Sequence, residues 1–217
     1  MEVRIKICGI TTLEDALAAV QYGTNALGFI LVKKSPRYVS PEKVRAIVSS
    51  LPPFIQTVGV FVNESPQEVR HLIEYCGLDL VQFHGEESPD YCKAFSTRAI
   101  KALRVKDASA IEEIDSYRDC VRGILLDSWS SKAHGGTGKR FDWDLARQAL
   151  DNKAGLPVIL AGGLDVSSVQ DAILKVRPFG VDVSSGVEVS PGKKDKKLVK
   201  DFIKRVKEAA QRVTARG

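Results

Sequence analysis

Two residues that can carry protons, Cys8 and Asp127, follow short β-like runs at corresponding places in the chain. The run Val3–Ile7 precedes Cys8 and the run Gly123–Leu126 precedes Asp127, and turn or loop residues follow each. An ionised thiol is a base, and a carboxyl group is an acid when its pKa is raised toward the working pH. The pair can therefore perform acid–base chemistry, provided that the fold brings both strand ends to one site.

A second group of residues is typical of anion binding. Ala161-Gly162-Gly163 follows one β-like run and leads into a helical pattern, while Ser184-Ser185-Gly186 follows the next run. Glycine lets the backbone approach a ligand closely, and free N–H groups at a helix N-terminus bind anions. The two turns together predict a phosphate site formed by Gly162, Gly163, Ser184, Ser185 and Gly186.

β-like runs and amphipathic helical patterns alternate eight times along the chain. We expect strands at 3–7, 26–31, 56–62, 80–83, 99–104, 123–126, 157–160 and 181–183. We expect helices near 12–22, 41–50, 66–76, 89–96, 108–117, 142–150, 166–176 and 194–213. A capping box at Thr11–Glu14 and the pairs Ser40-Pro41 and Ser65-Pro66 predict three of the helix starts.

This alternation predicts a parallel sheet, because each parallel connection needs a crossover helix, and eight parallel strands can close into a barrel. The alternative is an open doubly wound sheet, whose usual G-x-G-x-x-G after the first strand is absent here. We therefore predict an α/β protein, a single (βα)8 TIM barrel domain over residues 1–217. Barrel chemistry sits at the C-terminal ends of the strands, where Cys8 and Asp127 fall, and phosphate often binds after strands 7 and 8.

Strand alternation makes a further prediction about the barrel interior. If Cys8 points inward, so do Lys6, Asp182 and Ser184, and the first and last strands become neighbours when the barrel closes. An unpaired buried charge is very costly. We therefore predict that Lys6 pairs with an inward carboxylate, with Asp182 the leading candidate.

Composition narrows the class of protein. The chain of 217 residues is 44% apolar and carries a net charge of +5, and no run approaches the ~20 apolar residues of a membrane span. The start enters a strand pattern directly, and the four cysteines show no C-x-x-C spacing, so we expect a cytoplasmic protein with reduced thiols and no zinc site. The basic run Lys193–Lys207 has helical apolar spacing, so we interpret it as a solvated helix face rather than a nucleic-acid site.

Nine motifs, in order, resemble those of the phosphoribosylanthranilate isomerase family of tryptophan biosynthesis. They are Lys6–Thr11, Ser35–Pro41, Gly59–Asn63, Val81–Glu86, Leu125–Asp127, Gly135–Lys139, Phe141–Trp143, Leu160–Leu164 and Val181–Glu188. The resemblance implies a cofactor-free Amadori rearrangement of N-(5-phosphoribosyl)anthranilate to 1-(2-carboxyphenylamino)-1-deoxyribulose 5-phosphate.

The resemblance also implies roles for particular residues. Cys8 is expected to be the general base, Asp127 the general acid, and Arg37 the contact to the anthranilate carboxylate. The phosphate site falls on the turns already described. Apart from the resemblance, we expect Asp182 to bind substrate, and His84, which ends the fourth expected strand, to line the pocket. The loop His134–Lys139 fails the P-loop pattern, and we expect a lid or wall over the site instead.

Two other functions stay open at this point. Another phosphosugar barrel, such as an epimerase or a histidine-pathway isomerase, would suit the fold, but some of those use a carboxylate pair where this chain has Cys8. A non-catalytic barrel that binds an anion or RNA would be expected to lack a catalytic residue, whereas both are present. We expect a small phosphosugar substrate and no nucleic-acid or membrane partner, with either a monomer or a homodimer.

Overall fold

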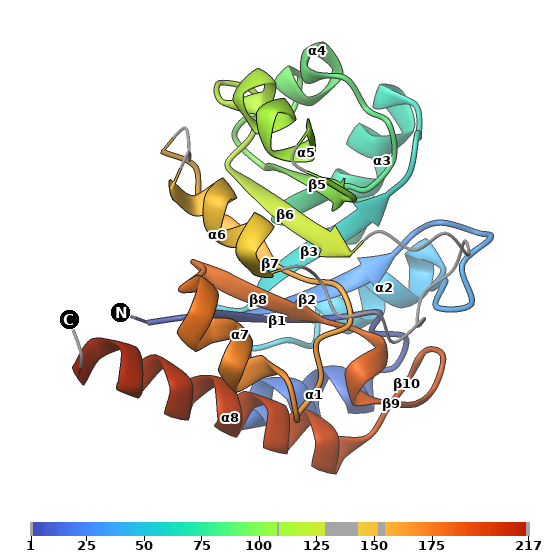
Figure 1. The fold of residues 1–217 in the computed structure, drawn as a ribbon. Coiled ribbons are helices and arrows are strands. Elements are labelled where there is room, and N and C mark those ends of the chain that lie inside the picture. The colour runs from blue at the N-terminus through green and yellow to red at the C-terminus, as the bar shows by residue number, and fades with distance from the viewer. Residues whose placement is uncertain (1, 108, 129–142, 152–154, 216–217) are drawn as a thin grey trace.

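The computed structural model describes residues 2–107, 109–128, 143–151 and 155–215, in which eight parallel strands close into a barrel in chain order. The strands are β1 (Arg4–Cys8), β2 (Ala26–Ile30), β3 (Gln56–Phe61), β4 (Leu80–Phe83), β5 (Ala99–Val105), β6 (Gly123–Ser128), β7 (Val158–Leu160) and β8 (Gly180–Val183). The α-helices are α1 (Leu13–Tyr22), α2 (Pro41–Val48), α3 (Pro66–Cys76), α4 (Pro89–Lys93), α5 (Ser109–Glu112), α6 (Trp143–Asp151), α7 (Val169–Val176) and α8 (Lys196–Ala215). The helices surround the strands (Figure 1).

The (βα)8 barrel expected from the alternation is confirmed, and each expected strand lies within two residues of an observed one. Two features were not expected. The helical pattern 108–117 divides into α5 and a 3-10 helix, Glu113–Tyr117. A hairpin of β9 (Glu188–Ser190) and β10 (Lys193–Lys194) follows β8 and the short 3-10 turn Ser185–Val187. In Figure 1 the hairpin lies at the opposite end of the barrel from the two chain termini.

Local signals explain where several helices begin. Ser40 and Ser65 cap α2 and α3, each directly before a proline, as predicted. The expected capping box on α1 is wrong by one residue, because Thr12 is the N-cap and its side chain accepts a hydrogen bond from the Asp15 N–H at 3.2 Å. This one-residue difference at the start of α1 does not change where the strands that carry the candidate site residues end.

The barrel interior changes character along its axis. One buried apolar cluster consists of Val58, Leu80, Ile100, Ala102, Leu125 and Ala161. The strands also carry buried polar residues, among them Lys6, Gln82 and Asp182. A larger apolar cluster between strands and helices holds the outer layer. Fully burying one such apolar side chain stabilises by about 1.5–3 kcal/mol, so this framework can hold polar groups at the barrel mouth.

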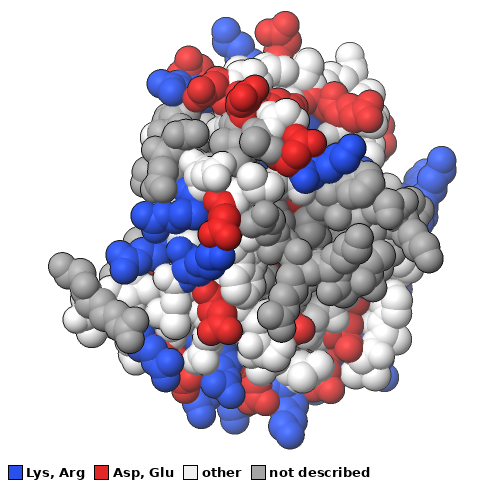
Figure 2. All heavy atoms as spheres, in the orientation of Figure 1, with Lys and Arg blue, Asp and Glu red and all other residues white. Residues whose placement is uncertain are grey.

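Surface charge is mixed on the face shown in Figure 2, where basic and acidic side chains are interspersed along the lower edge over α8. Two ion pairs involve α8: Lys196 contacts Glu14, and Lys204 lies 3.9 Å from Glu208. Among the described residues, no helix is both long and apolar enough to cross a membrane.

Candidate active site

Cys8 and Asp127 lie at the C-terminal end of the barrel on strands that are not neighbours. Cys8 is the last residue of β1, and Asp127 is the next-to-last residue of β6. Cys8 is 5% exposed, whereas the Asp127 side chain is 28% exposed. A buried sulfur and a partly open carboxyl group therefore approach the barrel mouth from different sides, as the sequence predicted.

His84 follows β4 and contacts Asp127 directly. Its Nε2 atom lies 3.1 Å from Asp127 Oδ2, and its Nδ1 atom lies 2.9 Å from the Gln82 amide nitrogen. With that amide donating to Nδ1, Nε2 is the ring nitrogen that carries a proton toward Asp127 Oδ2. This geometry favours the prediction that His84 lines the site. Gln82 was not singled out from the sequence.

The expected pairing of Lys6 with Asp182 is confirmed. The two residues are register partners on β1 and β8, and Lys6 Nζ donates to Asp182 Oδ1 at 2.9 Å with both side chains buried. Asp182 thus has an internal partner, and its binding of substrate stays a prediction. Lys6 Nζ also approaches Cys8 Sγ, because a Cβ on Gly28 would lie 3.0 Å from the first atom and 2.7 Å from the second.

Electrostatics around Cys8 act in opposite directions. Burial raises the pKa of the Cys8 thiol, the Lys6 ammonium opposes that shift, and the Asp182 carboxylate adds to it; the net direction is upward. For Lys6, burial alone would lower the pKa, but Asp182 and Cys8 reverse this and leave it raised. Lys6 is therefore a charged ammonium beside the sulfur.

Arg37 is held by a carboxylate from the far end of the chain. Its Nε atom donates to both Glu188 oxygens at 2.9 and 3.0 Å, and its Nη2 atom donates to Oε2 at 2.8 Å. Burial would raise the pKa of Glu188, but the Arg37 hydrogen bonds and the Lys194 ammonium leave it lowered. The Glu188 carboxylate thus stays ionised and fixes one edge of the guanidinium.

Lys194 corrects the interpretation of the basic run. The sequence placed it on a solvated helix face, but it lies on β10, is 4% exposed, and donates to Glu188 Oε1 at 2.9 Å. Its Nζ atom also donates to the backbone carbonyls of Cys8 at 2.5 Å and Ser184 at 3.2 Å. No sequence signal separated it from its exposed neighbour Lys193, because only the hairpin turns it inward.

The two glycine-containing turns adopt conformations that suit close approach of a ligand. Gly162 and Gly163 have φ values of +76° and +68°, in the left-handed region that glycine adopts at low cost. A Cβ on Gly186 would lie 2.0 Å from the Leu164 carbonyl oxygen, so the turns after β7 and β8 pack directly on each other. The Ser184 hydroxyl oxygen is buried and has no hydrogen-bond partner within the described residues.

One part of the phosphate prediction is wrong in detail. The expected free N–H groups where the helix after β7 begins are partly occupied, since Asp165 Oδ1 accepts from the Ser167 N–H at 2.8 Å and the Ser168 N–H at 2.9 Å. The α7 helix itself starts only at Val169. Backbone N–H groups of the glycine turns and of Ser185 and Gly186 are the better candidates for an anion, since the Val187 N–H already donates to the Ser184 carbonyl at 3.4 Å.

A buried ion pair fixes the loop that follows His84. Lys101 Nζ donates to Glu87 Oε2 at 2.9 Å and to the Gly85 carbonyl at 2.6 Å, and Glu87 Oε1 accepts from the Asn63 N–H at 2.7 Å. The two charged side chains are 2% and 1% exposed. This network ties the segments that follow β3 and β4 to Lys101 on β5.

The remaining cysteines are buried, as expected of packing residues: Cys76, Cys92 and Cys120 are at most 9% exposed. Burial raises the pKa of Cys76 to about 11 and of Cys92 to about 12. Among the described residues, no group of three or more His, Cys, Asp or Glu could hold a metal ion. The expected lid at His134–Lys139 lies outside the described residues.

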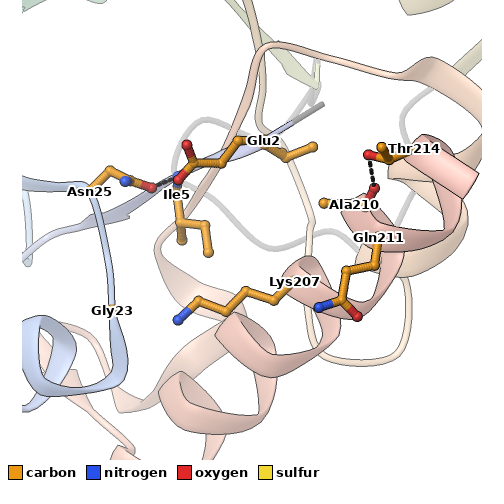
Figure 3. A pocket seen from close by; sticks show the side chains of 9 residues that line it. Glu2, Ile5, Gly23, Asn25, Lys207, Ala210, Gln211 and Thr214 are labelled. Atoms are coloured by element: carbon orange, nitrogen blue, oxygen red, sulfur yellow. Dashed lines mark hydrogen bonds between the residues drawn. The ribbon is translucent and has the colours of Figure 1, made fainter.

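Hollows also occur at the opposite end of the barrel, where the strands begin. One of about 490 Å3 lies between the start of β1 and α8 (Figure 3), and its lining includes Glu2 and Lys207 but no cysteine or histidine. Polar atoms there are paired within the fold, for example Asn25 Oδ1 with the Ile5 N–H at 2.8 Å.

Comparison with known proteins agrees with this geometry. The family model described as N-(5'-phosphoribosyl)anthranilate isomerase matches residues 5–205. A relative of that name from Pelobacter propionicus is 51% identical, and the alignment covers 98% of this chain and 99% of the relative.

The chain belongs to the N-(5'-phosphoribosyl)anthranilate isomerase family.

Solved structures of the isomerase family have the same fold. The family member from Thermotoga maritima has a TM-score of 0.89 at 47% identity, covering 95% of this chain and 99% of that one. A family structure in complex with reduced 1-(o-carboxyphenylamino)-1-deoxyribulose 5-phosphate has a TM-score of 0.85 at 45% identity, with the same coverage.

Proposed function

We propose that the chain, acting as one domain over residues 1–217, catalyses the isomerisation for which its family is named, with Cys8 as general base and Asp127 as general acid. The observation that carries this proposal is the placement of a thiol and a carboxyl group at the C-terminal ends of β1 and β6, each beside groups that influence its proton. A related family structure holds a reduced form of the product.

The two residues act in sequence. Asp127 donates its proton to the ribose ring oxygen; the C1–O bond breaks, and the nitrogen lone pair forms an iminium at C1. The iminium acidifies the C2 proton, which the Cys8 thiolate removes. The C–H electrons form a C1=C2 bond as the iminium pair returns to nitrogen, and the resulting enolamine tautomerises to the aminoketone. General acid and base groups each typically contribute ~100- to 10,000-fold.

Binding contacts follow from the same end of the barrel. A guanidinium has five N–H donors, and Glu188 engages those on Arg37 Nε and Nη2. We assign the anthranilate carboxylate to the Nη1 edge of Arg37, since planar bidentate pairing suits a carboxylate. The phosphate is assigned to the turns at Gly162-Gly163 and Ser184-Ser185-Gly186, and His84 to the pocket wall.

The decisive experiment is fluorescence turnover of freshly prepared phosphoribosylanthranilate by the wild type, Cys8→Ser and Asp127→Asn. We expect each variant to melt like the wild type and to lose at least ~100-fold in kcat, because a hydroxyl is a poorer base and an amide delivers no proton. Near-wild-type kcat in either variant would remove that residue from the mechanism. An inactive but folded wild type would instead favour another phosphosugar isomerase.

We also infer a homodimer that uses the end of the barrel where the strands begin. Phe54 is 99% exposed and has a φ of +72°, which is strained for a bulky residue. It borders a cavity of about 640 Å3 together with Phe179, which is 47% exposed. The Thermotoga maritima relative is described as dimeric. Sedimentation of the wild type and Phe54→Ser tests the inference, and a wild-type monomer at micromolar concentration would contradict it.

The cellular setting is the final part of the proposal. Reduced, buried cysteines and a small phosphosugar substrate suit a cytoplasmic enzyme that needs no nucleic-acid or membrane partner. Fractionation of cells that express the chain, followed by activity measurement in each fraction, tests this assignment.

A further inference from the structure

The Lys6 side chain lies between two acidic groups at the base of the site. It donates to Asp182 Oδ1 at 2.9 Å, and it extends toward Cys8, which is two positions further along the same inward face of β1. The space is created by Gly28, the register partner of Cys8 on β2. A Cβ there would lie 2.7 Å from Cys8 Sγ and 3.0 Å from Lys6 Nζ, so both atoms converge on the same gap.

Charge balance in this buried cluster depends on the state of the thiol. While Cys8 is a neutral thiol, the Lys6 ammonium and the Asp182 carboxylate balance each other. When Cys8 loses its proton, one ammonium faces two buried anions. Isolated buried charges are very costly, so the thiolate needs a share of the cation.

We propose that Lys6 is a positioning residue that stabilises the Cys8 thiolate, and that Asp182 competes with the sulfur for the same ammonium. The proposal rests on the proposed role of Cys8 as the base. It assigns the Lys6–Asp182 pair a second task besides stability: the pair sets how readily the base ionises.

Other charged groups reach Cys8 from the elements packed around it, and none of them replaces Lys6. From the hairpin, Lys194 Nζ contacts the Cys8 carbonyl oxygen rather than the sulfur. Glu188 contacts that lysine, and Arg37 contacts Glu188. Burial raises the pKa of the Cys8 thiol, Lys6 is the largest influence that lowers it, and Asp182 and Lys194 act as smaller raising and lowering influences.

The two partners therefore have opposite effects. Without the Lys6 charge, a thiolate would lie near Asp182 with no cation between them, so ionisation of Cys8 becomes harder. Without the Asp182 charge, the thiolate becomes the sole anion paired with Lys6, so ionisation becomes easier. A purely structural pair makes no such distinction, because loss of either partner only destabilises the fold.

The test measures the rate of Cys8 alkylation by iodoacetamide over about pH 5 to 10, which brackets the usual thiol pKa of about 8.5. Peptide mass spectrometry separates Cys8 from the other three cysteines in the full chain. We expect Lys6→Met to raise the midpoint by more than about one pH unit, so that alkylation near neutral pH slows about tenfold or more. We expect Asp182→Asn to lower the midpoint and to speed alkylation.

Two further variants make the result independent of folding problems. The double variant Lys6→Met/Asp182→Asn removes both charges, and replacing a buried pair as a whole is often tolerated; we expect its midpoint above the wild-type value. Arg4→Met removes an exposed cation from the same strand and is expected to leave the midpoint unchanged. Shifts of the same sign in both single variants, or an unchanged midpoint in the double variant, would overturn the proposal.

The alkylation rate measures ionisation of the Cys8 thiol and does not depend on catalytic activity. If Cys8→Ser retains activity, the proposed base is wrong, while the effect of Lys6 on the thiol is still measured. If Cys8→Ser is inactive and the alkylation midpoints of the Lys6 and Asp182 variants do not move, Cys8 is still supported as the base, but Lys6 does not stabilise its thiolate.

Discussion

Lys194 and Cys8 lie 186 positions apart in the chain, yet the Lys194 ammonium donates a hydrogen bond to the Cys8 carbonyl oxygen at 2.5 Å. The same ammonium contacts the Ser184 carbonyl and Glu188, so one buried side chain joins the ends of β1 and β8 to the β9–β10 hairpin. Because Glu188 in turn holds Arg37, this lysine connects the backbone of the proposed base with the proposed carboxylate contact.

Lys194→Met should destabilise the protein and reduce turnover. Removing one partner of a buried ion pair typically costs about 3–5 kcal/mol, and here it also leaves two backbone carbonyls without this donor. The matched control is Lys193→Met, the exposed neighbour on the same strand, which should melt like the wild type. Thermal melts and kcat/KM of both variants check this, and equal melting temperatures would mean that Lys194 does not hold the hairpin in place.

Glu188 should contribute to acid sensitivity. Its pKa is lowered in the folded protein, since Arg37 and Lys194 outweigh the effect of burial. A depressed carboxyl pKa contributes stability above the unfolded value of about 4.3, and that stability is lost as pH falls through the folded pKa. The free energy of unfolding should therefore fall more steeply below about pH 4 in the wild type than in Glu188→Gln.

Glu14→Gln is the control for that measurement. Glu14 also has a lowered pKa, from its contact with Lys196, but both side chains are exposed and the pair is screened by solvent. Urea unfolding at several pH values should show a much smaller change for Glu14→Gln. Parallel acid profiles for the wild type and Glu188→Gln would show that the buried carboxylate is not a source of acid sensitivity.

Regular patterns made the barrel predictable from the sequence. Strand and helix periods report burial on one face, and prolines after Ser40 and Ser65 mark helix starts, so these elements depend on local chemistry. The Lys6–Asp182 pair could also be predicted from the sequence, because alternation along two strands and closure of the barrel define which side chains face each other.

Contacts that depend on an irregular connection could not be predicted from the sequence. Lys194 stands in a basic run whose other members are mostly exposed, and only the hairpin after β8 buries it. Glu188 belongs to a motif quoted from the sequence, but no spacing rule links it to Arg37, 151 residues away. Gln82 lies on a predicted strand, and its role depends on the neighbouring His84 ring.

Gln82 should orient the proposed acid through His84. Gln82→Leu removes the amide 2.9 Å from His84 Nδ1, which frees the ring that contacts Asp127. Misplacement of a group near the chemistry by about 1 Å can cost ~100-fold, so we expect kcat to fall about 10- to 100-fold with KM little changed. The control is Gln67→Leu on the exposed face of α3. A wild-type kcat in Gln82→Leu would show that this amide does not help to orient Asp127.

Gly186 should control anion binding at the paired turns after β7 and β8. In Gly186→Ala the new Cβ would lie 2.0 Å from the Leu164 carbonyl oxygen, so the backbone of both turns must move. A ligand that binds only the folded state stabilises it, by about 2.7 kcal/mol at a concentration one hundred times its Kd. Inorganic phosphate should therefore raise the melting temperature of the wild type and raise that of Gly186→Ala much less.

The control for this last prediction is Gly77→Ala. Gly77 ends α3 with a φ of +70°, and a Cβ there meets its nearest neighbour only at 3.5 Å, so the substitution strains the backbone at a helix end without touching the turns after β7 and β8. Its melting temperature should fall, while phosphate should raise it by the same increment as in the wild type. If phosphate protects Gly186→Ala as strongly as Gly77→Ala, the anion binds somewhere other than these turns, and the assignment of Ser184, Ser185 and Gly186 must be abandoned.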